Sequence, residues 1–510
     1  MENNEKIKID WPVFGISGGI LVLFTAMALI DVDFAKATVN KSFAFSCTYF
    51  GAYWQVLLLL TFLIAIGLAC TKYGNVRIGN LDKPEMSTFK WISIIMCTLL
   101  AGGGVFWSAA EPLAHFLSPP PSFGVIAKGT KEAVAPAMAQ GFLHWGFLAW
   151  SILGSLAALP LMYYHYHKGL ALKPRLFLYP VFGDKVMKNW LGVTADATSL
   201  VAVAAGTIGP IGFLGLQLSY ALSKTFGIPD TYGTQFVIVA IATAIYAIAA
   251  CTGIQKGIEK LARFNVFLTI FVIAFTLIAG PGGFIIDAFL GAQGLMFDNF
   301  FNLTLYRAET GWLSWWTVFF WGWFLGYGPM MAILVARISR GRSVREIVIA
   351  ISILAPFITN FWFSVLGGSG IFYELSNPGS VSTAFASDGG FNLPAALMAI
   401  VSQFPLSQLM VPVCLVLVLL FLVTTGSGMA FSMAVAVTGV DEPPQWIRAF
   451  WAIAMGAVAA ALIFMGAGGI GALQSFIVVT AVPVGLLMLP TLYWGPKVCQ
   501  LLYDENNTDK

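Results

Sequence analysis

Charged residues are scarce in this sequence: they make up 10% of its 510 residues, while hydrophobic residues make up 58%. Soluble proteins carry about 25% charged residues. The deficit excludes a soluble globular domain and indicates an all-α polytopic membrane protein, with the lipid bilayer as its main environment. The net charge of +3 is too small and too dispersed to suggest a nucleic-acid partner.

Cysteine and histidine are also rare, with six and four copies. The cysteines are scattered, without the spacing of a metal site or of a disulfide framework, so we expect them to be packing residues. A membrane-embedded enzyme would need His, Asp, Glu or Cys side chains clustered at one depth, and the predicted spans show no such cluster. We therefore expect neither catalytic residues nor a cofactor.

Runs of about 20 apolar residues are long enough to cross the hydrocarbon core of a bilayer as helices. Twelve such runs can be counted, and no long polar linker separates them, so we predict one membrane domain over residues 1–510. The runs lie near residues 11–31, 51–71, 89–110, 138–164, 192–222, 233–254, 262–286, 313–336, 346–370, 406–436, 446–467 and 472–496. Two further amphipathic pieces, 293–306 and 389–403, are predicted to be interfacial.

The basic residues sort to one side of the predicted spans. With a cytoplasmic N-terminus and twelve crossings, 21 of the 27 lysines and arginines face the cytoplasm, and the exceptions are Lys36, Lys41, Lys128, Lys131, Lys224 and Arg307. Cytoplasmic loops of membrane proteins carry an excess of Lys and Arg. The sorting predicts a multi-pass protein of the cell inner (plasma) membrane with both termini in the cytoplasm.

The stretch 315–329 combines an apolar span with many aromatic side chains, among them Trp321, Trp323 and Tyr327. It leads into four arginines between positions 337 and 345, which indicates that this end lies in water. Aromatic faces attract cations without a formal counter-charge. The pattern therefore predicts a helix whose middle binds a cationic solute.

The fourth span adds Trp145 and Trp150, which could flank the same cavity. A single tryptophan is more typical of packing or of the interfacial belt, and the pair gains weight only beside the eighth span. His144 is expected to be a hydrogen-bonded core histidine, and Glu111 to cap an external loop. No acidic residue is expected deep in the membrane beside the tryptophans.

Three consecutive glycines, Gly102, Gly103 and Gly104, interrupt the third span. Each weakens a helix by roughly 1 kcal/mol relative to alanine and lets a ligand approach the backbone closely. Irregular backbone at membrane depth is tolerated where it lines an enclosed cavity, so the glycines are candidate substrate contacts. Close helix–helix packing is the alternative, and the pattern favours neither.

Thr424 and Thr425 lie in the tenth span, just before a Gly-Ser-Gly sequence. Hydroxyl and loosened carbonyl oxygens are the ligands that a desolvated alkali cation needs, because hard cations take oxygen ligands. Alternatively, the hydroxyls bond back to carbonyls of their own helix, as Thr and Ser commonly do.

The segments 316–324 and 336–346 resemble the signature of the betaine/choline/carnitine transporter family. Supporting matches, spread over most of the chain in the family's order, are Phe106-Trp107 with Glu111-Pro112, His144-Trp145-Gly146 with Trp150, and residues 253–257. The resemblance implies a secondary transporter with a LeuT-type core of two inverted five-helix repeats, residues 89–286 and 313–496. Two peripheral helices, residues 11–71, would precede the core, and the family further implies a homotrimer.

By position, the family's aromatic box falls on Trp145, Trp150 and the eighth span. A central box tryptophan is Phe324 here, and Leu153 replaces a family tyrosine. Both changes keep the pocket apolar but weaken its attraction for cations, since Trp is the best cation–π partner. Further positions that match the pathway or a second aromatic site are Trp321, Trp323 and Tyr327.

The resemblance also bears on ion coupling. Thr424 and Thr425 match the hydroxyl pair of a sodium site, which backbone near Ala101–Gly104 would complete. Asn265 stands where sodium-independent exchangers of the family have an arginine, which favours a real ion.

Two other positions weaken the case for a second ion. Met331 matches a methionine that substitutes for sodium near the substrate carboxylate in the exchangers. Only Thr207 remains of the hydroxyl pair that forms the family's second sodium site. One sodium site is therefore expected.

These patterns lead to one hypothesis, the import of a betaine-type zwitterion, such as glycine betaine or carnitine, with one sodium ion by alternating access. The carboxylate would lie against the glycines of the third span. One alternative is sodium-independent exchange of the carnitine/butyrobetaine kind. Another is transport of a small non-quaternary solute, such as a sulfonium compound, a sulfonate or an amino acid.

Overall fold

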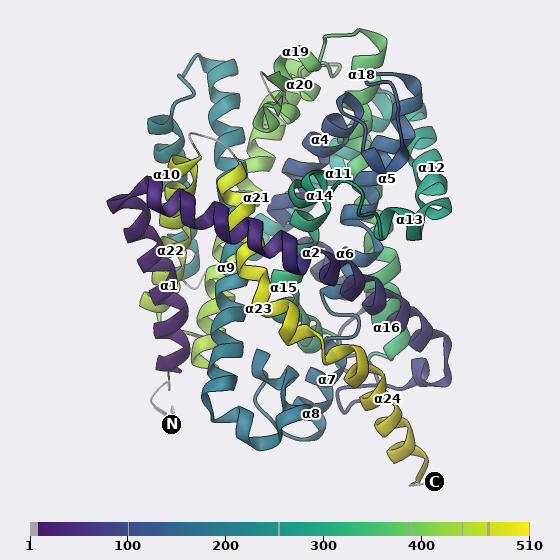
Figure 1. Cartoon of the computed structure of the whole chain (residues 1–510), viewed down its shortest axis with the longest axis vertical. Coiled ribbons are helices and arrows are strands. Elements are labelled where there is room, and N and C mark those ends of the chain that lie inside the picture. Colours follow the sequence, from purple (N-terminus) through teal and green to yellow (C-terminus); the bar gives the residue numbers. More distant parts are fainter. Residues whose placement is uncertain are drawn as a thin grey trace.

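The computed structural model describes residues 9–99, 101–252, 255–387, 390–440, 442–466 and 470–508. Within these ranges the chain is helical apart from turns and one short antiparallel pair, β1 (Ala386–Ser387) with β2 (Gly390–Phe391) (Figure 1). Helices satisfy their own backbone hydrogen bonds, as a bilayer requires, because its core offers no water. The predicted all-α polytopic fold is confirmed.

Nine helices or helix runs in the described residues are long and apolar enough to cross a membrane. They are α1 (Trp11–Ile30), α2 (Val32–Cys70), α9 (Trp190–Phe226), α10 (Tyr232–Cys251), α14 with α15 (Thr310–Trp315 and Thr317–Ile338), α16 to α18 (Val344–Ile349, Ala355–Phe363 and Ser369–Ser376), α21 (Ser407–Thr438), α22 (Gln445–Met465), and α23 with α24 (Gly471–Met488 and Thr491–Thr508). Helices α11 (Gln255–Ala279) and α12 (Gly282–Asp298), which bend by 105° at their junction, are long and apolar enough only when taken together, as a broken span or a re-entrant loop.

The third predicted span is helical on both sides of position 100, which lies outside the described residues, as α3 (Thr88–Leu99) and α4 (Ala101–Leu117). The fourth is divided into three short helices, α5 (Val134–Trp145), α6 (Phe147–Ile152) and α7 (Ala158–Met162). The helix break at Gly146 requires glycine, because an added Cβ would lie 2.1 Å from the carbonyl oxygen of Phe142. Twelve crossings and the division into two repeats therefore stay predictions.

The glycines of the third span do not unwind. Gly102, Gly103 and Gly104 are all helical, within α4. The expectation of an irregular backbone at these three positions is wrong.

Helix α2 is much longer than the predicted span 51–71. Its 39 residues span about 58 Å at 1.5 Å per residue, well beyond the roughly 30 Å of a hydrocarbon core. It begins at Val32 because the Asp31 carboxylate accepts a hydrogen bond from the Phe34 amide at 2.9 Å. Figure 1 shows α2 running obliquely across the other helices.

The two predicted interfacial pieces differ in outcome. Residues 293–306 fall on the end of α12 and on α13 (Phe300–Thr304), so the helix begins earlier than expected. Residues 389–403 include β2 and α20 (Ala396–Val401), and every residue of α20 is buried, with the helix packed on α4. The other short helices are α8 (Tyr179–Phe182) and α19 (Ser382–Phe385).

Helix α1 begins and α24 ends at the same end of the molecule, where α7 and α8 also lie (Figure 1). A buried ionic network joins segments at this end. Arg175 is held by Asp196 of α9 through two contacts of 2.7 Å, and by Asp10 at 3.1 Å. The Asp10 carboxylate also accepts a bond from Lys173 at 2.7 Å, and its backbone N–H bonds to Val437 of α21 at 2.8 Å.

We expect Asp196→Ala to lower the thermal unfolding midpoint markedly. Arg175 is only 5% exposed, and removal of one partner from a buried ion pair typically destabilises a protein by about 3–5 kcal/mol. The control is Glu505→Ala, whose salt bridge to Lys168 joins side chains that are 50% and 46% exposed, so the effect should stay within about 1 kcal/mol. Thermal unfolding of the purified protein in detergent measures both, and equal midpoints would contradict the prediction.

Candidate solute-binding site

A cavity of about 1240 Å³ lies among α3, α4, α5, α11, α15, α17 and α21. Gly103, Trp145 and Trp323 line its closed end, while Lys173 and Arg337 line the other end. Phe89 also lines the cavity and is 85% exposed, so the cavity reaches the surface there. The open end therefore lies at the arginine-rich end of α15, the side predicted to be cytoplasmic.

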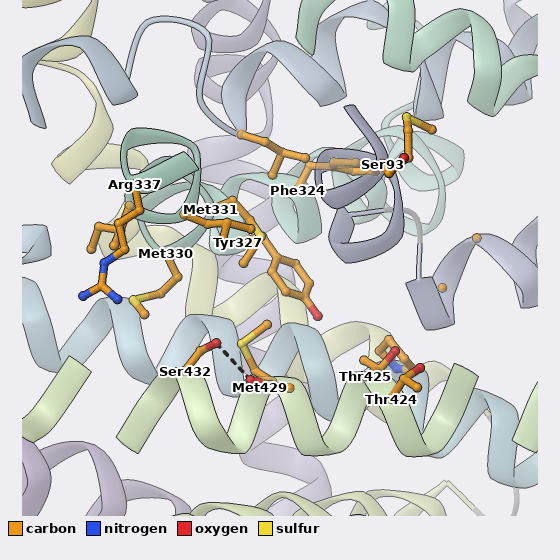
Figure 2. A pocket seen from close by; sticks show the side chains of 18 of the residues that line it. Ser93, Phe324, Tyr327, Met330, Met331, Arg337, Thr424, Thr425, Met429 and Ser432 are labelled. Atoms are coloured by element: carbon orange, nitrogen blue, oxygen red, sulfur yellow. Dashed lines mark hydrogen bonds between the residues drawn. The ribbon is translucent and has the colours of Figure 1, made fainter. Parts of the chain in front are cut away.

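Helices α15 and α21 face each other across the cavity (Figure 2). Nine of the predicted site residues line it, and they come from α4, α5, α15 and α21. They are Gly103, Gly104, Trp145, Trp323, Phe324, Tyr327, Met331, Thr424 and Thr425. Leu153, Met330 and Asn265 line it as well.

The closed end is an aromatic wall, formed by Trp145, Trp323 and Phe324. The ring centroid of Trp145 lies 5.7 Å from that of Trp323 and 5.3 Å from that of Phe324, with interplanar angles of 80° and 84°. These edge-to-face contacts are a favourable arrangement for aromatic pairs. The Trp323 indole is held further by a 3.0 Å hydrogen bond from its Nε1 to the carbonyl of Gly206.

Gly103 lets this wall form against the backbone of α4. A Cβ at this position would lie 2.4 Å from Cη2 of Trp323 and 3.3 Å from Cη2 of Trp145. The next carbonyl, of Gly104, accepts a 3.1 Å hydrogen bond from Nε1 of Trp362 on α17. Both interpretations of the glycines therefore apply, since Gly103 permits close packing and also lines the cavity.

Two predicted contacts do not reach the cavity in this conformation. Trp150 is buried behind it, and its Nε1 donates to the Thr359 hydroxyl at 3.0 Å. Trp321 is fully buried on another side of α15, with its ring 6.5 Å from that of His144. Neither could touch a solute in the cavity as it stands, which corrects the expectation for both. The Ala101 side chain and the surroundings of Gly102 lie outside the described part of the chain.

The hydroxyl of Thr424 bonds to its own helix, to the carbonyls of Leu420 at 2.8 Å and Phe421 at 3.3 Å. The hydroxyl oxygen keeps lone pairs that can face a cation, because it acts as the donor in these bonds. On α11, which packs against α21, the Oδ1 atom of Asn265 is buried without a hydrogen-bond partner among the described residues. An unpaired amide oxygen of this kind can also accept a cation.

Sequence reasoning missed a polar cluster behind the aromatic wall, the Glu111 cluster, formed by Glu111, His115 and His144. The three side chains are at most 1% exposed, and Oε1 of Glu111 lies 2.5 Å from Nδ1 of His144 and 3.3 Å from Nε2 of His115. Oε2 of Glu111 accepts the indole N–H of Trp145 at 2.9 Å. The expectations that Glu111 caps a loop and that no acid lies beside the tryptophans are wrong.

Beyond the wall, on the side away from the open end, packed aromatic side chains close the path through the protein. We call this cluster the aromatic plug. The ring of Trp107 on α4 lies 4.9 Å from Phe320 and 5.5 Å from Phe319 of α15, and 5.6 Å from Phe213 of α9. All four side chains are fully buried. The cavity is thus open at one end and closed at the other.

The chain matches the model of the betaine/carnitine/choline family transporters over residues 12–501. It is 54% identical over 494 residues to glycine betaine transporter 2 of Vibrio parahaemolyticus, covering 97% of this chain and 91% of that protein. It is 31% identical to a probable glycine betaine transporter of Desulfitobacterium hafniense, with 94% and 96% covered. A solved structure of a Na+-coupled sialic acid symporter shares 13% identity and a TM-score of 0.45, over 89% of this chain and 87% of that one.

The apolar helices and the family match together define a multi-pass membrane transporter, not an enzyme. More narrowly, the chain belongs to the betaine/carnitine/choline transporter family. This confirms the family expected from the tryptophan-rich span and the arginines that follow it.

We expect a cysteine at Ser432 to react with a membrane-impermeant maleimide from the side at which the cavity opens. Ser432 lines the cavity, whereas Ser427 on the same helix is 1% exposed and provides the matched control. Inside-out vesicles carrying Ser432→Cys should be labelled, and those carrying Ser427→Cys should not. Mass spectrometry of the α21 peptide separates this label from native cysteines, and labelling of Ser432→Cys confined to right-side-out vesicles would contradict the prediction.

Proposed function

We propose that the protein is a secondary transporter that imports glycine betaine, or a closely related quaternary ammonium zwitterion, by alternating access. The observation that carries the proposal is the wall of Trp145, Trp323 and Phe324 at the closed end of the cavity. A quaternary ammonium group has no N–H to donate, so aromatic faces are the usual means of holding its charge. The named solutes of the two relatives above agree with this chemistry.

The carboxylate of the solute would lie against Gly103 and Gly104 of α4. Both glycines line the cavity, and the lack of side chains lets an anion approach the backbone closely. Helical glycines would thus take the role that the sequence predicted for unwound ones.

The conformation supports the inward-facing half of a transport cycle. The cavity opens at the arginine-rich end, while the plug around Trp107 closes the opposite side. In the other half of the cycle, α15 would separate from α4 and α5 at the plug, and the cavity mouth near Lys173 and Arg337 would close. Uptake requires a solute to bind in both states and leave from each.

One sodium ion per cycle is the coupling that we propose, bound near Thr424 and Thr425. Support comes from the oxygen atoms on this part of the wall, including the unpaired Oδ1 of Asn265. A second sodium ion at Thr207 has less support, because the Thr207 hydroxyl already contacts the Tyr327 hydroxyl at 3.1 Å in addition to its bond to the Val203 carbonyl. A homotrimer and cytoplasmic termini remain predictions from the family and from the charge pattern.

Proteoliposomes containing the purified protein should accumulate radiolabelled glycine betaine when an inward sodium gradient is imposed. Equal uptake with potassium in place of sodium, combined with a need for internal substrate, would convert the proposal to exchange. No uptake of any betaine, together with uptake of ectoine or an amino acid, would contradict the quaternary ammonium assignment.

Thr424→Val separates sodium binding from folding in the same assay. It removes one hydroxyl, so the sodium concentration for half-maximal uptake should rise by roughly tenfold, as for the loss of one good ligand. Ser432→Ala on the same helix removes a hydroxyl that bonds to Gly428 at 2.9 Å and should leave the sodium dependence unchanged. Identical sodium curves for both variants would argue against the site.

Gly103→Ala should weaken glycine betaine binding by at least roughly tenfold, since its methyl group would displace the Trp323 indole from the wall. Gly428→Ala is the matched control, because Gly428 lines the cavity and a Cβ there meets no atom within 4 Å. Isothermal titration calorimetry on the full chain measures both affinities. Comparable affinities for the two variants would mean that the wall does not hold the solute.

A further inference from the structure

The Glu111 cluster joins the three helices that carry the aromatic wall. Glu111 and His115 belong to α4 and His144 to α5, while Nε2 of His144 lies 2.8 Å from the hydroxyl of Thr317, the first residue of α15. On the other side, Oε2 of Glu111 holds the indole N–H of Trp145. A single buried carboxylate thus contacts both the imidazoles at the closed side and a tryptophan that faces the cavity.

The hydrogen bonds around His144 fix where its ring proton lies. Nε2 of Gln140 is 2.9 Å from Nε2 of His144, and an amide N–H can only donate. With this amide orientation the ring nitrogen accepts, and the neutral ring carries its proton on Nδ1, facing Oε1 of Glu111, a carboxylate oxygen that can only accept, at 2.5 Å. When both imidazoles are neutral and Glu111 is ionised, the cluster has a net charge of −1. Binding of one further proton makes the cluster neutral.

In this conformation the donor atoms are arranged for a shared hydrogen and not around a metal ion. Glutamate and two histidines are common zinc ligands, but two ligand atoms of a tetrahedral zinc ion lie roughly 3.3 Å apart. Oε1 of Glu111 and Nδ1 of His144 are 2.5 Å apart, a separation that a shared hydrogen accounts for. The geometry favours a proton-binding site.

We infer that the Glu111 cluster binds one proton in competition with the quaternary ammonium group of the solute at Trp145. The inference rests on the proposed function. A carboxylate enclosed by apolar side chains is costly when charged and uncompensated. A cation on the face of Trp145 compensates that charge through one indole ring, whereas a proton on the cluster removes it. Each ligand therefore weakens the other, and the coupling is reciprocal.

No other titratable side chain is hydrogen-bonded or ion-paired to the cluster among the described residues. Those carried by elements packed around α4, α5 and α15 lie elsewhere: Asp196 pairs with Arg175, and Glu374 of α18 binds the loop 379–382. The exposed acidic and basic ones are Asp33, Lys36, Lys41, Lys90, Lys131, Glu132, Lys224, Asp287, Asp298 and Arg337. A pH dependence of binding that disappears with Glu111 would therefore report on the cluster itself.

The sign of the effect follows from the charges. As pH rises, the cluster loses its proton and becomes negative, so affinity for glycine betaine should rise, by roughly tenfold between the protonated and deprotonated limits. Binding at a pH near the midpoint should release a fraction of a proton. Calorimetry of the full chain with glycine betaine, at several pH values and in buffers of different ionisation enthalpy, measures the affinity and the proton release together.

Glu111→Gln keeps an oxygen to accept the Trp145 N–H but cannot ionise, so its affinity should become independent of pH. Glu374→Gln, which removes a carboxylate away from the cavity, should keep the wild-type pH profile. Wild-type binding without proton release at any pH between about 5.5 and 7.5, roughly one unit on either side of the ordinary histidine pKa, would overturn the inference whether or not the variant folds. An unchanged pH profile in Glu111→Gln would overturn it equally. If no betaine binds at any pH, the proposed function itself fails, which is a distinguishable result.

Discussion

The rest of the site depends on the contacts that fix the side chain of Trp145. Its indole nitrogen is bound to Glu111, and its ring packs edge to face with Trp323 and Phe324. The missing side chain of Gly103 provides the space in which the Trp145 and Trp323 rings meet. A tryptophan held by polar and apolar contacts at once has little rotational freedom, so the wall is preorganised and little ordering cost falls on binding.

This arrangement explains why the fourth span is broken. A continuous helix of 20 residues presents side chains around its whole circumference at a fixed spacing of 1.5 Å along the axis. The break at Gly146 follows directly after Trp145, next to the cavity. Broken helices are tolerated at such depth because the freed groups face protein or a cavity and not lipid.

Part of the fold and part of the candidate site could be predicted from the sequence. The scarcity of charge and the apolar runs predicted the membrane class, and the pattern from Trp316 to Glu346 predicted the family. Most of the predicted site residues line the cavity, because the aromatic and hydroxyl positions of α15 and α21 match the family's pattern. Trp150 and Trp321 were misplaced because spacing along a helix does not say which neighbour each face meets. The span α5–α7 was expected to be continuous because hydropathy averages over a short break.

The Glu111 cluster marks the limit of sequence reasoning. Glu111 and His115 are four residues apart, a spacing that places both on one helix face and could have been noticed. Their contact with His144 joins positions 33 apart in the chain. Composition and periodicity determined which segments are helical and apolar, because these are local properties of some 20 residues. Only the tertiary structure decided that a carboxylate, two imidazoles and an indole share one buried site, because that depends on the angles at which the broken helices pack.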